Sequence, residues 1–175
     1  VVVRISGRGS DKFLQGQFSQ NLDEVIPGRS PRAAAATPKG RAYCLTRMVR
    51  DGNDILMDFP SDLADDIISH LRKYLMLFRG TTMEVVQEVS IIGILGNQLA
   101  ESLAGDTLES LKEPGDSIAL RNGVLVKTQP TAEGTARFEF WQTEDREVAL
   151  PASDRIPTTD WQASEIAAGV ASLTA

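Results

Sequence analysis

The sequence predicts an α+β protein in which short antiparallel strands alternate with a few amphipathic helices. The chain of 175 residues is long enough to bury the core of one domain or of two small ones. Alternating apolar patterns with turn residues between them predict hairpins within 42–59 and 118–126. An apolar stripe at helical spacing between 61 and 76 predicts the longest helix of the chain.

We expect two lobes, of which the first is discontinuous in the sequence. The first lobe is predicted to comprise 1–87 plus 158–175, with the N-terminal strands and the long helix. A smaller, ferredoxin-like lobe is predicted for 88–157, because its order of strand, helix, strand and strand is typical of part of a split β-α-β unit.

The first elements are a strand and a short helix. Residues 1–6 are rich in β-branched side chains, which favour a strand. Ser10 or Asp11 is expected to cap a helix that carries Phe13 and Leu14 inward. A strand at the first residue leads us to expect that the chain starts inside a larger protein.

The first glycine turn follows this helix at Gly16. A glycine at this position can end the helix in the left-handed conformation without a Cβ clash. Gln15 and Gln17 are then displayed around a tight bend. Their amides are candidates for ligand contact.

The second glycine turn connects a strand expected at 32–37 to the hairpin that follows. Lys39 and Arg41 flank Gly40, so a bend here could direct a cation and backbone N–H groups at an anionic ligand. A solvated hairpin corner explains the same residues equally well. Both interpretations stay open at this point.

The next hairpin is the clearest in the chain. Residues 42–49 alternate in polarity, 51–53 supply turn chemistry, and the alternation resumes through Phe59. Cys44 lies in the strand interior, where a buried and inert thiol is the usual outcome.

The long helix is expected to begin after a cap at Ser61. Its acids come first and its bases last, in agreement with the helix dipole. The lone histidine, His70, lies near the polar side of this helix. A catalytic base needs a positioned partner and none is evident, so we expect a solvated histidine.

The second half of the chain predicts one or two strands within 84–94 and a helix from Asn97 to Gly105. Asn122-Gly123 is a strong hairpin signal, and a further strand contains Phe138. Residues 142–157 are polar and contain prolines, and we assign no element to them.

The last predicted helix, over 160–168, carries Trp161 in its first turn. Thr159 and Gln162 have the spacing of a capping box, and Gly169 can end the helix. The indole offers a flat face for an aromatic ligand, but a tryptophan wedged between two lobes is the commoner arrangement, and the residues alone favour it.

Composition excludes several classes of protein. The net charge of −6 and the pI near 4.8 argue against a general nucleic-acid surface. No apolar run approaches the length of a membrane span. The single cysteine, Cys44, cannot form an internal disulfide or a cysteine-based metal centre. A protein without disulfides is typical of a reducing compartment. We therefore expect a cytoplasmic protein, and we expect it to be a monomer. Dinucleotide and phosphate-loop motifs are absent.

Six short motifs, in this order and spacing, resemble those of the YgfZ-type folate-binding proteins, relatives of the glycine-cleavage aminomethyltransferase (T-protein). The similarity runs almost end to end and is weakest between 105 and 155. The motifs are Ile5-Ser6-Gly7, Lys12-Phe13-Leu14-Gln15-Gly16-Gln17, Lys39-Gly40-Arg41, Arg50-Asp51-Gly52, Leu71-Arg72-Lys73-Tyr74 with Phe78, and Trp161 with Glu165-Ile166-Ala167-Ala168-Gly169.

The resemblance implies a T-protein-like body that binds tetrahydrofolate or a derivative. It further implies an accessory role in maintaining iron–sulfur enzymes and in tRNA modification. From the net charge we expect no direct nucleic-acid binding, and from the residues after the Lys-Gly turn no classical enzyme activity. Trp161 corresponds to a folate contact of the family. Lys39 and Arg41, with Gln15 and Gln17, are expected to form walls of a pocket that faces Trp161.

Two departures from the family pattern matter. Three features of the family are expected outside this chain: a signature Lys-Gly-Cys-Tyr-x-Gly-Gln segment with a reactive cysteine, the C-terminal barrel, and a second folate-contacting tryptophan. Cys44 is not the equivalent of that reactive cysteine. The transferases are expected to carry acidic residues after the Lys-Gly turn, where this chain has Leu45 and Thr46. A folate-dependent one-carbon transferase and a non-catalytic interaction module with a vestigial pocket are therefore kept as alternatives to the folate-binding accessory protein.

Overall fold

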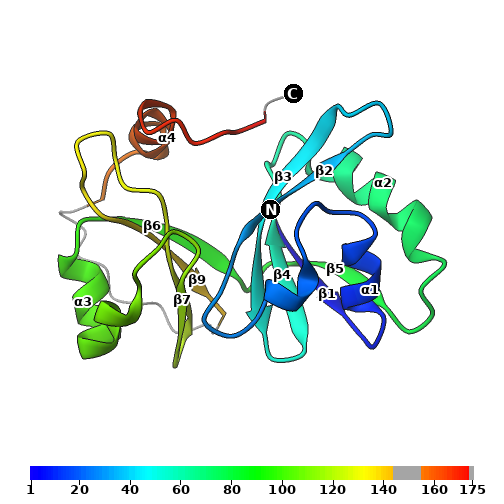
Figure 1. Cartoon of the computed structure of the whole chain (residues 1–175), viewed down its shortest axis with the longest axis horizontal. Coiled ribbons are helices and arrows are strands. Elements are labelled where there is room, and N and C mark those ends of the chain that lie inside the picture. Colours follow the sequence, from blue (N-terminus) through cyan, green and yellow to red (C-terminus); the bar gives the residue numbers. More distant parts are fainter. Residues whose placement is uncertain (144–154, 174–175) are drawn as a thin grey trace. The chain divides into compact units, whose positions relative to one another are not determined.

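The computed structural model describes residues 1–143 and 155–173, and the chain divides into two compact units. The first unit is Val1–Gln87 with the described residues from Ser172 on, and the second is Glu88–Ala171. Both units combine an antiparallel sheet with helices (Figure 1). The α+β class predicted from the sequence is confirmed.

The sheet of the first unit has five strands in the order β2-β3-β4-β1-β5. All neighbouring strands are antiparallel, and β3 and β4 form the hairpin predicted at 51–53. The strands are β1 (Val2–Ser6), β2 (Arg32–Ala36), β3 (Ala42–Asp51), β4 (Asp54–Asp58) and β5 (Thr82–Val86).

Two α-helices and a short 3-10 helix complete the first core. They are α1 (Ser10–Gln15), η1 (Leu22–Glu24) and α2 (Ala64–Leu75). Phe13 and Leu14 are fully buried, as the sequence predicted, and they belong to one apolar cluster with Ile67 and Leu71 of α2. This cluster fixes α1, and with it the first glycine turn, against the sheet.

The expected caps of α1 and α2 are wrong. The cap positions are Gly9 and Leu63, and neither makes a side-chain cap hydrogen bond. Asp11 is unavailable as a cap because its carboxylate pairs with Arg50 of β3. Ser61 lies before the helix begins, so the N-terminus of α2 depends on packing and on its early acids instead.

The second unit contains a four-stranded sheet in the order β6-β9-β8-β7, with all neighbours antiparallel. The two strands expected within 84–94 are β5 and β6. Its elements are β6 (Ser90–Leu95), α3 (Gln98–Ala104), η2 (Gly105–Ser110), β7 (Ser117–Leu120), β8 (Gly123–Lys127), β9 (Arg137–Gln142) and α4 (Thr158–Ala167).

One face of this sheet packs under α3 and η2. Its core includes Ile94 of β6, Leu125 of β8, and Phe138 and Phe140 of β9. The strands β6 and β7, which flank α3, are the outer strands and run antiparallel to each other. The connection therefore differs from a split β-α-β unit, in which the flanking strands are parallel.

Helix α4 belongs to the second unit, whereas the sequence analysis assigned 158–175 to the first lobe. The difference arises because Trp161 and Glu165 of α4 contact β9. The cap position is Pro157, which makes no side-chain cap hydrogen bond, so the capping box expected at Thr159 does not form. Gly169 has the expected positive φ of 70° just beyond the helix. Most of the segment 142–157, to which the sequence assigns no element, lies outside the described residues.

Candidate functional site

The indole of Trp161 lies against strand β6 at Gly93. A Cβ atom placed on Gly93 would come 2.7, 2.8 and 2.9 Å from the ring carbons Cε3, Cζ3 and Cδ2. Three adjacent ring atoms at nearly equal distance indicate that the ring approaches the strand with its face. The absence of a side chain at Gly93 therefore allows Trp161 to lie flat on the sheet, and the residue as a whole is half-buried.

Arg137, the first residue of β9, lies against the same indole. Its Cζ atom is 4.1 Å from the Trp161 ring centroid, a cation–π contact. Its Nη2 atom is 3.1 Å from Oε1 of Glu165, one turn further along α4. Strand alternation places Arg137 on the face opposite Phe138 and Phe140, so it projects away from the core under α3.

The guanidinium of Arg137 is only partly satisfied. Its side chain is 1% exposed, yet Nε and Nη1 have no hydrogen-bond partner in the part of the chain that the structure describes. A buried donor without an acceptor costs about 1–3 kcal/mol, and most buried polar groups in proteins are paired. The arrangement is therefore a buried guanidinium covered by the indole ring of Trp161, with two nitrogens that have no acceptor among the described residues. Such a group can recognise a carboxylate.

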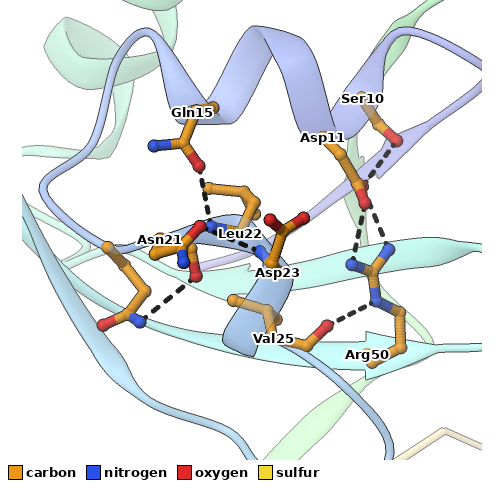
Figure 2. Close-up of polar contacts among 9 residues, drawn as sticks. Ser10, Asp11, Gln15, Asn21, Leu22, Asp23, Val25 and Arg50 are labelled. Atoms are coloured by element: carbon orange, nitrogen blue, oxygen red, sulfur yellow. Dashed lines mark hydrogen bonds and ion pairs between the residues drawn. The ribbon is translucent and has the colours of Figure 1, made fainter.

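Gln15 has a structural contact in the first unit. Its Oε1 accepts a 2.8 Å hydrogen bond from the backbone N–H of Leu22, which ties the end of α1 to η1 (Figure 2). Gly16 has φ −82°, so the left-handed bend predicted there is wrong. The chain instead tightens through bonds from the Gly16 and Gln17 N–H groups to the carbonyls of Phe13 and Leu14. Gln17 is half-buried and the Gln15 side chain is exposed.

Lys39 and Arg41 lie at the corner between β2 and β3. The Thr37 N–H donates to the Arg41 carbonyl at 2.8 Å, and the Gly40 N–H donates to the Thr37 carbonyl at 2.8 Å. Gly40 has φ 80°, which a side chain rarely tolerates. Lys39 and Arg41 are both exposed, so the corner presents two cations at its surface.

A second arginine cluster, missed by the sequence analysis, stabilises this unit. Arg50 of β3 donates through Nη1 and Nη2 to the two carboxylate oxygens of Asp11, both at 3.0 Å, and through Nε to the Val25 carbonyl at 2.9 Å (Figure 2). Each nitrogen of this guanidinium donates to an acceptor, so the cluster links α1 and the residue after η1 to β3, and its role is structural.

The two side chains considered for reactivity are both packed. Cys44 is fully buried, and burial, followed by the charge of Asp58, raises the pKa of its thiol from 9.0 to about 12. It is an inert thiol at neutral pH, as predicted. His70 is half-buried between Tyr43 and Tyr74, at ring-centroid distances of 4.6 and 5.3 Å, so it is less solvated than expected.

The second unit also contains a cavity of about 650 Å³ at the α3 end of its sheet. Its lining includes Glu101, Asp106, Glu109 and Lys127. The Lys127 ammonium donates to the carbonyls of Leu111 and Lys112, both at 3.0 Å, so its position is structural. None of the ligand contacts predicted from the sequence lines this cavity.

Two negative findings concern the described residues, 1–143 and 155–173. They contain no group of three or more acidic, histidine or cysteine side chains placed to hold a metal ion. They also contain no helix long and apolar enough to cross a membrane.

The structure brings Trp161 together with Gly93, Arg137 and Glu165, of which the sequence analysis had named only Trp161 as a ligand contact. A signal was present, because Arg137 and Glu139 alternate with Phe138 and Phe140 along one strand. That alternation predicts a polar sheet face. That Gln15, Gln17, Lys39 and Arg41 share a pocket with Trp161 stays a prediction.

Comparisons with known proteins agree with this fold. No protein-family model matches the chain. Over 100 residues, 57% of this chain, it is 26% identical to the tRNA-modifying protein YgfZ of Shigella boydii serotype 4 (strain Sb227). It is 27% identical over the same length to the protein of that name from Escherichia coli O157:H7 (strain EC4115 / EHEC). Each match spans 30% of the relative's own length.

A solved structure is similar over more of the chain. The glycine cleavage system aminomethyltransferase T from Bartonella henselae superposes with a TM-score of 0.62 over 81% of this chain and 39% of its own, at 13% sequence identity. The resemblance to YgfZ proteins and the T-protein-like fold predicted from the sequence are therefore confirmed.

Proposed function

We propose that this protein binds tetrahydrofolate or a derivative and acts in the cytoplasm as an accessory protein for iron–sulfur enzymes and tRNA modification. The likeness to proteins named tRNA-modifying and the fold of a glycine-cleavage aminomethyltransferase support the biological setting. The observation that carries the ligand is the position of Trp161. Its ring packs on Gly93 and against Arg137 while the residue is only half-buried, which suits a platform for a flat heterocycle.

The residues of the first unit enter this proposal in different ways. Lys39 and Arg41 are exposed cations that can contact the anionic tail of a folate. Gln15 already uses its oxygen on Leu22, so its contribution is to hold the turn, and only its amide NH₂ stays available. Gln17 is assigned the role of a pocket wall.

The strand after the Lys-Gly turn favours a binding protein over a transferase. Cys44, Leu45 and Thr46 supply no carboxylate there. Asp58 lies nearby, but its Oδ1 accepts the Arg47 backbone N–H at 2.6 Å and the Thr46 hydroxyl at 3.4 Å. A general base needs a free carboxylate within reach of the substrate. A glycine-cleavage assay with lipoyl carrier protein should therefore give no turnover above background.

Calorimetric titration of the full-length protein with tetrahydrofolate tests the ligand. We expect saturable binding and a loss of at least about tenfold in affinity in Trp161→Ala, since stacking on an aromatic side chain contributes on the order of 1–3 kcal/mol. The matched control is Ile166→Ala, because Ile166 lies on the same helix and is 73% exposed. Absence of saturable binding, or equal affinity in Trp161→Ala, would remove the proposal.

A deletion strain tests the accessory role. Under oxidative stress, its iron–sulfur tRNA-modifying enzymes should lose activity, and a gene copy of the full-length protein should restore it. The Trp161→Ala copy should restore less than the Ile166→Ala copy at equal protein level. Equal rescue by both copies would separate the cellular role from folate binding.

A further inference from the structure

We propose that Arg137 is the receptor for a carboxylate of the bound ligand, and that Glu165 of α4 holds this position while the ligand is absent. The inference rests on the proposed function, because it names the part of a folate that this site recognises. It assigns a binding role to two residues that the sequence motifs did not single out as contacts.

The first argument is the unused hydrogen-bonding capacity of Arg137. A guanidinium carries five N–H donors, in a fork that fits a carboxylate with two parallel bonds. Glu165 takes only one of the three nitrogens, through Oε1 at 3.1 Å. The Nε and Nη1 atoms have no acceptor among the described residues although they are buried. By contrast, all three nitrogens of Arg50 are bonded.

The second argument is the position of Arg137 against the indole. The Trp161 ring covers the guanidinium carbon at 4.1 Å from its centroid, so a ligand carboxylate must reach the group from the side that Glu165 occupies, next to the indole. A folate combines a flat ring system with carboxylates. One molecule can therefore offer partners of the right kind to both side chains.

The third argument concerns charge. Arg137 is 1% exposed and its partner Glu165 is 28% exposed, so Glu165 can turn to solvent at low cost while Arg137 cannot. A ligand carboxylate that replaces the Glu165 carboxylate leaves the buried cation paired. The exchange thus avoids an uncompensated buried charge. The α4 helix must yield locally for the ligand to reach the covered nitrogens.

The test compares a ligand with the carboxylates and one without them. Full-length protein is titrated with tetrahydrofolate and with 6-methyltetrahydropterin, which keeps the pterin and lacks the benzoylglutamate. In Arg137→Met we expect tetrahydrofolate affinity to fall about tenfold or more, because the charged hydrogen bonds to its carboxylate are lost. Affinity for the pterin should change less than about twofold, because the methionine side chain still packs against the indole in place of the cation–π contact.

Glu165→Gln gives a second test that does not remove a buried group. It abolishes the competing carboxylate, so we expect tetrahydrofolate to bind several-fold more tightly and the pterin to bind as before. Asp160→Asn is the matched control, since it removes one exposed negative charge from the same helix. Its effect on tetrahydrofolate binding measures the general electrostatic contribution.

The outcomes separate this inference from the proposed function. If the wild-type protein binds neither ligand, the proposed function and the inference both fail. If tetrahydrofolate binds and Arg137→Met weakens both ligands equally, Arg137 only supports Trp161 and the inference is overturned. It is also overturned if Glu165→Gln binds tetrahydrofolate no more tightly than Asp160→Asn. This second comparison does not use Arg137→Met, so it tests the inference even if that variant does not fold.

Discussion

Arg50 of the first unit and Arg137 of the second both extend from strands, and their guanidinium groups differ in how fully they are bonded. Arg50 makes a two-pronged contact with Asp11 and a third bond to the Val25 carbonyl. Arg137 is more deeply buried and has one carboxylate contact, to Glu165, with two nitrogens unbonded. A guanidinium whose three nitrogens all donate to protein acceptors serves the fold, whereas a buried guanidinium with two unbonded nitrogens has capacity left for a ligand.

The largest expected effect is a contrast between two equivalent substitutions. Arg50→Met should lower the free energy of unfolding by about 1–3 kcal/mol. It removes the part-buried hydrogen bond to the Val25 carbonyl, and it removes the ion pair with Asp11, whose contribution is reduced because the Asp11 side chain is 53% exposed. Arg137→Met should leave stability within about 1 kcal/mol or raise it, since a buried guanidinium with two unbonded nitrogens is replaced by an apolar side chain and Glu165, 28% exposed, can turn to solvent. Urea unfolding of both variants measures the difference, and a larger loss in Arg137→Met would break the comparison.

An effect of similar size to that of Arg50→Met is expected at Gly93. In Gly93→Ala the new methyl group would meet the Trp161 ring at 2.7 Å, so the ring must move and we expect a loss of about 1–3 kcal/mol from overpacking. Tryptophan emission should shift to the red as Trp161 becomes more exposed. In a Trp161→Ala background the same substitution should cost nothing, and a double-mutant cycle measures this coupling. A cost that persists without the indole would show that Gly93 is needed for the strand itself.

A smaller loss of stability is expected from substitutions in the first glycine turn. Gln15→Ala should lower stability by about 1 kcal/mol, because the Leu22 N–H loses its acceptor, and Gln17→Ala should lower it less. Tetrahydrofolate affinity should fall further in Lys39→Ala than in Gln15→Ala. Thermal unfolding and calorimetry on the same samples check both statements. A Gln15→Ala protein of normal stability and weak binding would make Gln15 a ligand contact.

The smallest effect at neutral pH concerns Cys44. Its thiol has a pKa of about 12 in the fold against 9.0 as the ordinary value, so the folded protein keeps the proton where the unfolded chain loses it. The resulting stabilisation is complete below about pH 9 and is lost as the pH rises toward 12. A thiol reagent should label the native protein very slowly at pH 8 and the unfolded protein at once. Cys44→Ser should show a weaker alkaline loss of stability than wild type, and fast native labelling would contradict the burial.

The contrast between the two arginines also explains how far the sequence can predict this protein. Local patterns determined the hairpin at 51–53, the hairpin of β7 and β8, the inward faces of α1 and α2 and the burial of Cys44. The loop of the second hairpin is Arg121-Asn122, one residue before the predicted Asn122-Gly123. Each of these depends on residues within a few positions of one another. Apolar periodicity and turn chemistry are therefore enough to predict them.

Side-chain partners from distant segments required the tertiary structure. Asp11 could have capped α1, but Arg50 approaches from β3 and takes its carboxylate. Gly16 could have adopted a left-handed bend, but Gln15 ties the chain to Leu22 and the turn stays right-handed. In both cases a local preference worth about 1 kcal/mol yields to contacts that form only when the sheet is assembled.

The candidate site shows the same division. The sequence by itself determined that Trp161 stands in the first turn of a helix, and its motifs indicated the YgfZ-like, T-protein-like fold. Only the tertiary structure placed that helix in the second unit and brought Gly93, Arg137 and Glu165 to the indole. The reason is physical: helical spacing is a local property of the backbone, whereas the burial and pairing of a guanidinium depend on which distant segments exclude water from it.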